Sequence, residues 1–345
     1  MGITNQEYFL LFALAYLLVG ALTPLMRKLA IVTDVVDRPN ALHKSHKKTV
    51  PYLGGVAIII GVVTTSYSAL LFSNYTSNTL WLASSVLAPA VILGLIGLWD
   101  DVKSLKPLPR FIAQSVVGIF TAIILVATDT VGNPTGSILF DSLFTILWVV
   151  GICNAINFFD NLDGGAAGTI AISAVTLAYL SLNGDQFLIA ALATVTAGAT
   201  LGFLVWNKSP AKIYMGDAGS LFLGFLIAAL TIRLDSKVNS EPSSYLVPIF
   251  LLAIPILDTS VAVLSRLRRH ISPFQGGQDH LSHRLIRAGL SRKQAAITLW
   301  GLTAIFAFFV ILINQPTLSI QNYIAITAGV FWILLFIIFF RTKDL

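Results

Sequence analysis

Apolar residues follow one another in long runs along almost the whole chain, and short polar segments separate these runs. Eleven of them are about 17 to 22 residues long, enough to cross a hydrocarbon core of about 30 Å as a helix. They lie near residues 8–26, 53–72, 80–99, 111–128, 138–159, 166–182, 187–206, 218–233, 245–265, 295–313 and 322–340. A helix satisfies its own backbone hydrogen bonds inside a membrane. The pattern therefore predicts an all-α polytopic membrane protein with about eleven transmembrane helices.

Composition supports this prediction. The chain is 56% hydrophobic and 11% charged, whereas about 25% of the residues of an ordinary soluble domain are charged. The first run has no basic residue ahead of it and no small-residue cleavage site, so it predicts a permanent helix rather than a signal peptide. No segment is left over for a separate soluble domain, and residues 1–345 are expected to form one membrane domain. Cys153 is the only cysteine, so an intrachain disulfide is excluded.

The basic residues predict the orientation of the helices. Eleven crossings place alternate loops on opposite faces, and 20 of the 22 Lys and Arg residues then fall on one face, with Arg233 and Lys237 on the other. By the positive-inside rule the basic face is cytoplasmic, the N-terminus is outside and the C-terminus is inside. The pI near 9.4 then reflects topology and a surface suited to anionic lipid or phosphate. Nucleic acid is not needed to explain it.

The acidic residues separate between the same two faces. Those on the outer face are scattered and most simply read as solvated loop charges. They are Glu7, Asp129, Asp141, Asp185, Asp235 and Glu241. The cytoplasmic face carries nine aspartates and all five histidines. Chemistry is therefore expected at the cytoplasmic face.

Two cytoplasmic segments carry paired carboxylates. In LWDDVKSLKPLPRF, Asp100 and Asp101 are adjacent, and like charges repel unless a cation or a shared proton compensates. In NAINFFDNLDGG, Asp160 and Asp163 are three residues apart and would share one face if the helix continued. The two glycines that follow allow a ligand to approach the backbone closely. The alternatives are a solvated helix end for the first segment and an Asn- and Asp-rich turn for the second.

Two further segments offer groups that bind anions. In PAKIYMGDAGSLFLG, Asp217 comes just before an apolar run, at a helix N-terminus whose free N–H groups suit a phosphate or a metal that holds one. Simple N-capping by Asp217 or Ser220 is the alternative. In DHLSHRL, His280, His283 and Arg284 offer imidazole and guanidinium groups to anionic oxygens. A zinc site is not expected, because this loop contains no cysteine.

One carboxylate lies within an apolar run. Asp258 is about 12 Å from the cytoplasmic end of run 245–265, at about 1.5 Å per helical residue. An ionised Asp inside a membrane is costly, so Asp258 is expected to face the protein interior with a partner. Structural pairing and a role in the site are both open.

In their order and lettering these four segments, together with DRPNALHKSHKKTVPYLGG, resemble the polyprenyl-phosphate N-acetylhexosamine-1-phosphate transferases of glycosyltransferase family 4. The resemblance is to the WecA and TagO types and, more distantly, to the MraY type, and it covers the whole chain. The chain departs from the family motifs at single positions, which bear on the sugar donor. These positions are His43 for Arg, Thr49 for Pro, Asn161 for Gly, Gly165 for Leu and Ser282 for His. The signature of the MurNAc-pentapeptide branch is absent, so that donor is not expected.

The resemblance implies transfer of a sugar 1-phosphate, first of all GlcNAc 1-phosphate, from a UDP-N-acetylhexosamine to polyprenyl (undecaprenyl) phosphate. UMP would be released, and the product would start a lipid-linked glycan of the cell envelope. The resemblance also implies Mg²⁺ as cofactor, with Mn²⁺ as an alternative, and a place in the inner (plasma) membrane. The expected partners are the two substrates and membrane lipid, and a homodimer is left open.

The same resemblance implies roles for individual residues. Asp217 and Asp101 are the expected metal ligands, and Asp100 is expected to position or deprotonate the lipid phosphate. Asn157, Asp160 and Asp163 would bind the nucleotide and complete the metal site. The further expected substrate contacts are His280, His283 and Arg284 for the donor phosphates, Lys44 and His46 for the lipid phosphate or the donor, and Asn154 and Lys212.

Other classes of membrane protein fit less well. A secondary transporter places its site near the midplane between internal repeats, whereas here the carboxylates gather at one face and no repeat is seen. An intramembrane aspartyl protease would need a GxGD setting, which MGD around Asp217 matches only in part. A CDP-alcohol phosphotransferase would show DGxxAR, and DGGAAG lacks the arginine. The transporter is the main alternative to the transferase.

Overall fold

The structure is a computed structural model of the chain. It describes residues 4–37, 49–72, 76–103, 105, 107–132, 134–236, 241–273, 277–315 and 320–342. Within these residues the chain forms helices and one two-stranded antiparallel hairpin. The helices are α1 (Asn5–Val32), α2 (Gly54–Phe72), α3 (Ser77–Lys103), α4 (Pro107–Ala127), α5 (Ile138–Phe159), α6 (Gly165–Asn183), α7 (Phe187–Asn207), α8 (Gly216–Ile232), α9 (Glu241–Leu251), α10 (Ala253–Arg268), α11 (Leu281–Arg287), α12 (Arg292–Ile313) and α13 (Gln321–Arg341), and the strands are β1 (Val36–Asp37) and β2 (Val50–Pro51).

The predicted all-α polytopic architecture is confirmed. Among the described helices, nine are long and apolar enough to cross a membrane, or ten if the bent pair α9 and α10 is counted as one crossing. The predicted run 245–265 is this pair, which bends by 77°. Prolines at 248 and 255 flank the break, and proline lacks the N–H that a continuous helix needs. The expected number of eleven crossings is therefore reached only if the shorter α8 is also counted.

Helix α8 is the centre of the molecule. It has 17 residues, and every residue from Ala218 to Thr231 is buried, as expected for a helix that is apolar on all sides. Helices α2, α3 and α5 pack against it. Because α8 is enclosed by protein, its ends need not reach both surfaces of a bilayer.

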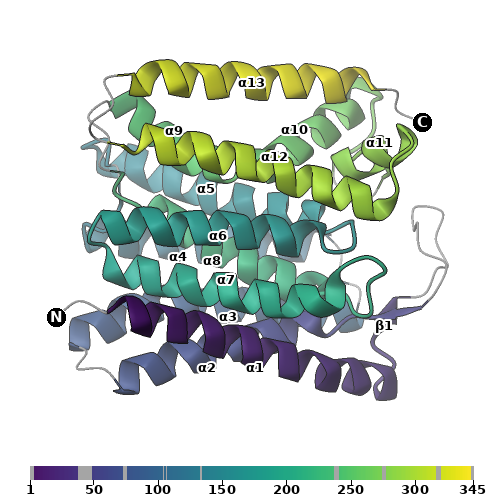
Figure 1. Ribbon diagram of the computed structural model, residues 1–345, viewed down its shortest axis with the longest axis horizontal. Coiled ribbons are helices and arrows are strands. Elements are labelled where there is room, and N and C mark those ends of the chain that lie inside the picture. The colour runs from purple at the N-terminus through teal and green to yellow at the C-terminus, as the bar shows by residue number, and fades with distance from the viewer. Residues whose placement is uncertain are drawn as a thin grey trace.

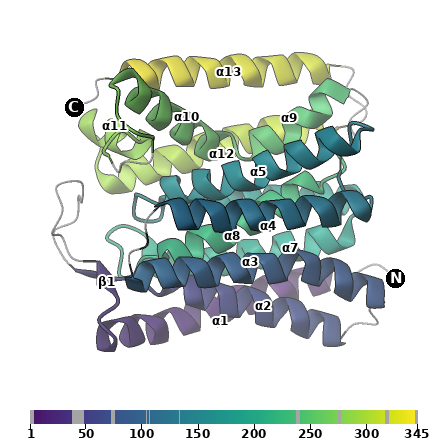
Figure 2. The same cartoon turned by 180° about the vertical axis from the view of Figure 1, so that it is seen from behind.

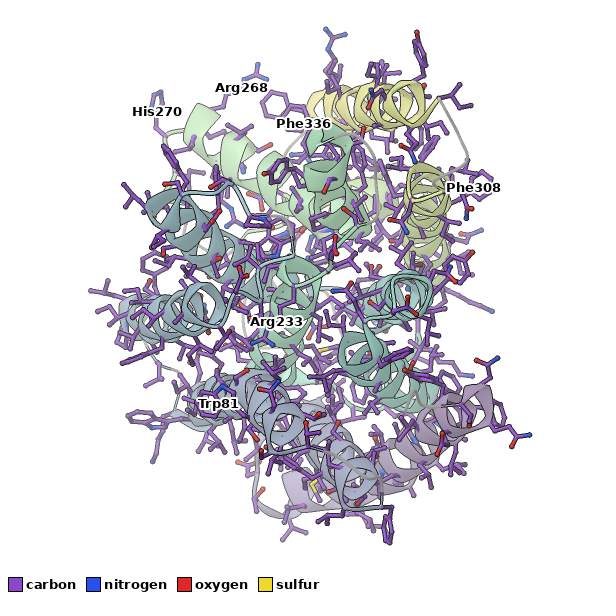
Figure 3. The ribbon with its side chains drawn as sticks, turned by 90° about the vertical axis from the view of Figure 1, so that its left-hand side faces the viewer. Trp81, Arg233, Arg268, His270, Phe308 and Phe336 are labelled. Atoms are coloured by element: carbon purple, nitrogen blue, oxygen red, sulfur yellow. The ribbon has the colours of Figure 1, made fainter. Side chains whose placement is uncertain are left out.

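The remaining helices lie side by side around α8, with α1 and α2 at one edge of the bundle and α13 at the opposite edge (Figures 1 and 2). Large apolar side chains point outward, for example Phe9 and Phe308, which are 72% and 60% exposed. Seen along the bundle, Trp81 and Phe308 lie at the periphery and Arg233 lies among the helices (Figure 3). An apolar outer surface of this kind is what a hydrocarbon environment requires.

The two ends of the bundle differ in what they carry. The N-terminus of α1 lies at one end, and the hairpin β1–β2, α11 and the C-terminal end of α13 lie at the other (Figure 1). This second end also holds Asp101, which accepts from the backbone of Asp217 at the start of α8, and Asp163, which accepts from the backbone of Ala211 in the α7–α8 loop. The chemistry-bearing segments of the sequence therefore meet at a single end, as the topology predicted.

A glycine allows α3 and α8 to approach closely near this end. A Cβ atom at Gly97 of α3 would overlap the backbone of Asp217 and lie 2.6 Å from the backbone nitrogen of Ala218. No flexible side-chain end is involved, so a larger residue could be accommodated only by moving the start of α8. The position of Asp217 thus depends on the absence of a side chain at residue 97.

Gly97→Ala is expected to lower the free energy of unfolding by about 1–3 kcal/mol, the usual cost of overpacking. Gly151→Ala is the matched control, because a Cβ atom at Gly151 of α5 would meet no atom within 4 Å. Alanine favours a helix over glycine by about 1 kcal/mol, so the control should be at least as stable as the wild type. Thermal unfolding of both variants in the same detergent measures the difference. Equal unfolding temperatures would contradict the close approach of α3 and α8.

Candidate active site

Four helices bring polar side chains together at the start of α8. Asp100 is at the end of α3, Arg110 in the first turn of α4, Asn157 near the end of α5 and Asp217 in the first turn of α8. Nη1 of Arg110 lies 2.8 Å from Oδ2 of Asp100 and 2.5 Å from Oδ2 of Asp217. Nδ2 of Asn157 donates to Oδ1 of Asp217 at 2.7 Å and to Oγ of Ser220 at 2.9 Å. This group is called the carboxylate cluster below.

Asp101, next to the cluster, caps α8 from a different helix. Its Oδ1 accepts from the backbone nitrogen of Asp217 at 2.8 Å and its Oδ2 from that of Ala218 at 3.0 Å. The N–H groups that the sequence offered to a phosphate therefore already have an acceptor. The alternative of a cap by Asp217 or Ser220 is not observed, since the residue at the N-cap is Met215 and it makes no side-chain cap hydrogen bond. A negative charge at this position is also favoured by the helix dipole.

Asp160 and Asp163 do not share a helix face. Helix α5 ends at Phe159 and Asp160 is its C-cap, so the helix does not continue and the alternative of an Asn- and Asp-rich turn is the one observed. Asp163 is buried, accepts from the backbone nitrogen of Ala211 at 3.2 Å and lies 3.5 Å from Arg292. Burial, together with the negative charges of Asp217 and Asp163, raises the pKa of Asp160 to about 7. Asp160 can therefore gain or lose a proton near neutral pH.

The turn after Asp163 is fixed by residues from two other helices. Gly164 has φ +72, a conformation that favours glycine. Its N–H donates to Oδ1 of Asn207 at 3.0 Å, and its carbonyl accepts from the indole of Trp300 at 3.1 Å. Nδ2 of Asn207 in turn donates to the carbonyl of Ile213 at 2.9 Å. The α5–α6 loop and the α7–α8 loop are thus held as one unit.

A buried polar network joins the start of α11 to α10. Asp258 is fully buried, and its carboxylate contacts Nδ1 of His280 at 2.7 Å and accepts from the backbone nitrogen of Leu281 at 2.7 Å. The expectation that Asp258 faces the interior with a partner is confirmed. Arg266 binds Asp279 through two hydrogen bonds of 2.8 and 2.7 Å. Burial alone would raise the pKa of Asp279, but the hydrogen bonds and charge of Arg266 lower it below its ordinary value.

His283, in α11, is half-buried, whereas His280 at the N-cap of this helix is buried. Burial, with the neighbouring His280, lowers the pKa of His283 to about 4, so its imidazole is neutral at pH 7 and can donate a hydrogen bond without carrying a charge. Beside it, the hydroxyl of Ser282 donates to Oδ1 of Asn161 in the α5–α6 loop. Both of these departures from the family motifs, Ser282 and Asn161, are thus in contact with each other. This contact joins α11 to the loop that carries Asp160 and Asp163.

Arg284 does not reach the carboxylate cluster. It is buried, with Nε donating to the carbonyl of Asp279 at 2.9 Å and Nη2 to Oγ of Ser265 at 2.6 Å. Its Nη1 donates to the carbonyls of Phe339 and Thr342 at 2.8 and 2.6 Å. The guanidinium therefore ties α11 to the end of α13. Its nitrogens are thus engaged within the fold, and the expected contact of Arg284 with a donor phosphate stays a prediction.

Two other expected contacts differ in their surroundings. Nδ2 of Asn154 donates to Oε1 of Gln114 at 2.5 Å and to the carbonyl of Val150 at 2.8 Å, between α5 and α4. The ammonium group of Lys212 lies 5.1 Å from the centre of the Trp206 ring. Lys212 is exposed on the α7–α8 loop and remains free to meet a ligand at this end. Lys44 and His46 lie outside the described residues.

Several residues of the site were not singled out from the sequence. Arg110 was noted as a basic residue of the cytoplasmic face and as part of the segment that resembles the family, but it was given no role, although it stands ten residues after Asp100, on the facing helix. No role was expected for Asn207, Arg266 or Asp279. Their functions depend on partners that are distant in sequence, which spacing alone does not reveal.

The carboxylate cluster could hold a metal ion with help from a substrate. Within the described residues, no three His, Cys, Asp or Glu side chains form a metal site by themselves. Mg²⁺ usually takes one or two carboxylates and completes its shell with water and phosphate oxygens. Asp100 and Asp217 form such a pair, since a single nitrogen of Arg110 is within hydrogen-bond distance of both. Asp100 and Asp217 already share one cation, and carboxylate oxygens are the ligands that a hard divalent ion prefers.

Known proteins match this chain over nearly its whole length. A model of glycosyl transferase family 4 matches residues 83–235, which include Asp100, Asn157 and Asp217. A probable undecaprenyl-phosphate N-acetylglucosaminyl 1-phosphate transferase of Bacillus subtilis is 34% identical over 333 residues, covering 95% of this chain and 87% of the relative. A decaprenyl-phosphate N-acetylglucosaminephosphotransferase of Mycolicibacterium smegmatis is 32% identical, covering 89% and 82%.

A third relative matches only part of the chain. It is a phospho-N-acetylmuramoyl-pentapeptide-transferase of Streptococcus uberis, 32% identical over 207 residues, covering 55% of this chain and 61% of the relative. The extent of the first two matches, together with the shared family model, identifies the group. The chain belongs to the polyprenyl-phosphate N-acetylhexosamine-1-phosphate transferases of glycosyl transferase family 4.

Proposed function

We propose that this chain transfers N-acetylglucosamine 1-phosphate from UDP-N-acetylglucosamine to undecaprenyl phosphate and so starts a lipid-linked glycan of the cell envelope. The names of the relatives from Bacillus subtilis and Mycolicibacterium smegmatis support the sugar and the polyprenyl acceptor. The observation that carries the proposal is the carboxylate cluster, in which Asp100, Asp217 and Arg110 meet at the end of the bundle where the loops gather. The positive-inside rule supports a cytoplasmic position for this end in the plasma membrane, with the N-terminus outside.

The reaction requires little beyond charge neutralisation and alignment. An oxygen of the lipid phosphate bonds to the phosphorus that carries the sugar, and the bond from this phosphorus to the UMP oxygen breaks, so that UMP leaves with the electron pair. All reacting groups are anions, and in phosphoryl transfer the protein chiefly positions them and compensates their charge. Mg²⁺, when bound, would neutralise phosphate oxygens and hold them in line.

Asp100 and Asp217 are the proposed metal ligands, in place of the pair Asp101 and Asp217 expected from the sequence. Both oxygens of Asp101 cap α8, whereas Asp100 and Asp217 share one cation. A general base is not required, because a phosphate is already nucleophilic at neutral pH. Asn157 orients Asp217 through its amide. Asp160, Asp163 and the neutral His283 lie around the α5–α6 loop and are proposed to contact the nucleotide and the donor phosphates.

A secondary transporter was the alternative from the sequence. The relatives are named as transferases, and the polar groups gather at one end of the bundle rather than between repeats at the midplane. No observation favours transport.

Purified protein in detergent is expected to release UMP from UDP-N-acetylglucosamine only when undecaprenyl phosphate and Mg²⁺ are both present. A panel of UDP-sugars with UMP detection tests the choice of donor, and Asp217→Asn serves as the control without turnover. Release of UMP from another UDP-sugar alone would change the donor. Absence of UMP release from every UDP-sugar would refute the transferase.

The two neighbouring carboxylates should differ in what their loss affects. Asp100→Asn is expected to weaken the apparent affinity for Mg²⁺ by at least about tenfold, which is the scale of damage even for groups that only support a metal ligand. Asp101→Asn should lower the free energy of unfolding by about 0.5–2 kcal/mol, as the loss of a helix cap does. Magnesium titrations of turnover and thermal unfolding of both variants separate these effects. The opposite pattern would restore Asp101 as the metal ligand.

The loss of His283 and the loss of Arg284 should be seen in different measurements, the first in donor kinetics and the second in stability. His283→Ala is expected to lower kcat/KM for the UDP-sugar by about tenfold to several hundredfold, since a hydrogen bond to a charged group is worth about 1.5–3 kcal/mol. Arg284→Ala should lower the free energy of unfolding by at least about 3 kcal/mol, because several buried carbonyls lose their donor. Arg287→Ala is the control, since Arg287 is exposed and donates to one carbonyl. A fully stable Arg284→Ala protein with impaired donor kinetics would return Arg284 to the site.

A further inference from the structure

Arg110 occupies an unusual position for a basic side chain at the membrane surface. Its side chain is 19% exposed, and one nitrogen lies between carboxylate oxygens from two different helices, Asp100 of α3 and Asp217 of α8. Among the described residues, the other hydrogen-bond donors to these two carboxylates from outside the pair are uncharged. They are the backbone nitrogen of Leu105 at 2.6 Å from Asp100 and the amide of Asn157 at 2.7 Å from Asp217. Among the described ion pairs, Arg110 is thus the cation that this pair of carboxylates shares.

The charge of the cluster gives this arginine a clear role. Asp100 and Asp217 would otherwise face each other, with Asp101 beside them on the backbone of α8. Carboxylates this close repel strongly unless a cation or a shared proton compensates, and here Nη1 of Arg110 lies within hydrogen-bond distance of both. Arg110 therefore allows the pair to remain assembled while the site holds no other cation.

A divalent ion needs the same oxygens that Arg110 uses. The oxygens nearest to Arg110 are Oδ2 of Asp100 and Oδ2 of Asp217. A guanidinium and a divalent ion held by the same two oxygens would repel each other by several kcal/mol at an effective dielectric constant of about 20. The two cations consequently compete for the pair.

We propose that Arg110 is a resident counter-ion that holds the metal position of the carboxylate cluster, gives way to the divalent ion, and then binds the phosphate of the lipid acceptor. This proposal rests on the proposed function for the identity of the metal and of the acceptor. Arg110 is thereby a positioning residue of the empty site and a substrate contact of the loaded one.

The surroundings of Arg110 indicate which phosphate it meets. It lies in the first turn of α4, whose apolar neighbours Leu108, Phe111 and Ile112 are 66%, 39% and 53% exposed and so face the lipid side of the bundle. A polyprenyl phosphate reaches the cluster from the bilayer, past this turn, whereas a nucleotide sugar arrives from water. The planar fork of an arginine matches phosphate oxygens in a bidentate manner. Release from the carboxylates leaves the guanidinium beside the path of the acceptor.

The first test measures metal binding without substrates. Mn²⁺ binding to purified protein, followed by the loss of the free-ion EPR signal, should be about tenfold tighter in Arg110→Gln than in the wild type, because a competing cation has been removed. Arg110→Lys keeps the charge and should bind Mn²⁺ within about threefold of the wild type. Arg287→Gln is the matched control, since it removes an exposed positive charge from the same end without touching the cluster. Arg110→Met, also uncharged, replaces the Gln variant if that variant does not fold.

The outcomes separate this proposal from the function on which it rests. Asp100→Asn should weaken Mn²⁺ binding in the same assay. If Asp100→Asn does so and Arg110→Gln is no tighter than Arg287→Gln, the role of Arg110 as a counter-ion is wrong and the metal site stands. If the wild type binds no Mn²⁺, the metal requirement of the proposed function is wrong, and the present proposal falls with it.

The second test measures the acceptor. In Arg110→Gln the KM for undecaprenyl phosphate should rise by about tenfold or more, as expected for the loss of a charge-assisted hydrogen bond, while the KM for the UDP-sugar stays within about threefold of the wild type. The variant would then bind its metal more tightly and turn over more slowly, a combination that simple loss of structure does not produce. A selective rise in the KM for the UDP-sugar would overturn the assignment of Arg110 to the acceptor.

Discussion

The start of α8 inside the protein is the constraint on which the site depends. A helix that begins away from water leaves backbone N–H groups that need acceptors. Asp101 provides them from α3, and it can do so only because Gly97 lets α3 approach the same turn. Once this turn is fixed, the carboxylate of Asp217 meets Arg110 of α4 and Asn157 of α5. The geometry of the cluster is therefore set by a helix cap, and the reactive groups are arranged around it.

The sequence predicted the parts of this molecule that depend on local pattern. The apolar runs correspond to helices, the charged segments meet at one end, and Asp258 has the buried partner expected of it. What the sequence did not predict was the pairing. Asp101 and Asp217 are 116 residues apart and Arg110 and Asp217 are 107 apart, so no periodicity relates them. Adjacent carboxylates look equivalent in a sequence, yet one caps a helix and the other faces a cation.

Arg284 illustrates the same limit. An arginine beside two histidines in a polar loop is equally compatible with an anionic ligand and with the carbonyls at the end of another helix. Only its burial and its distances to Phe339 and Thr342 decide between these. The bend between α9 and α10 was hidden for a related reason, because the apolar run continues through the break. Hydropathy records how apolar a segment is, whereas its direction here changes at a break flanked by prolines.

The link from Arg284 to the end of α13 has a consequence for how the protein is made. Chains are synthesised from the N-terminus, and every member of the carboxylate cluster precedes residue 218. The cluster can therefore assemble while later helices are still being inserted. The hydrogen bonds that hold α11 cannot all form at that stage, since two of them require the carbonyls of residues 339 and 342. During biogenesis the cluster is thus expected to exist before α11 is locked in place, and the second half of the site closes only when the last described helix has entered the membrane.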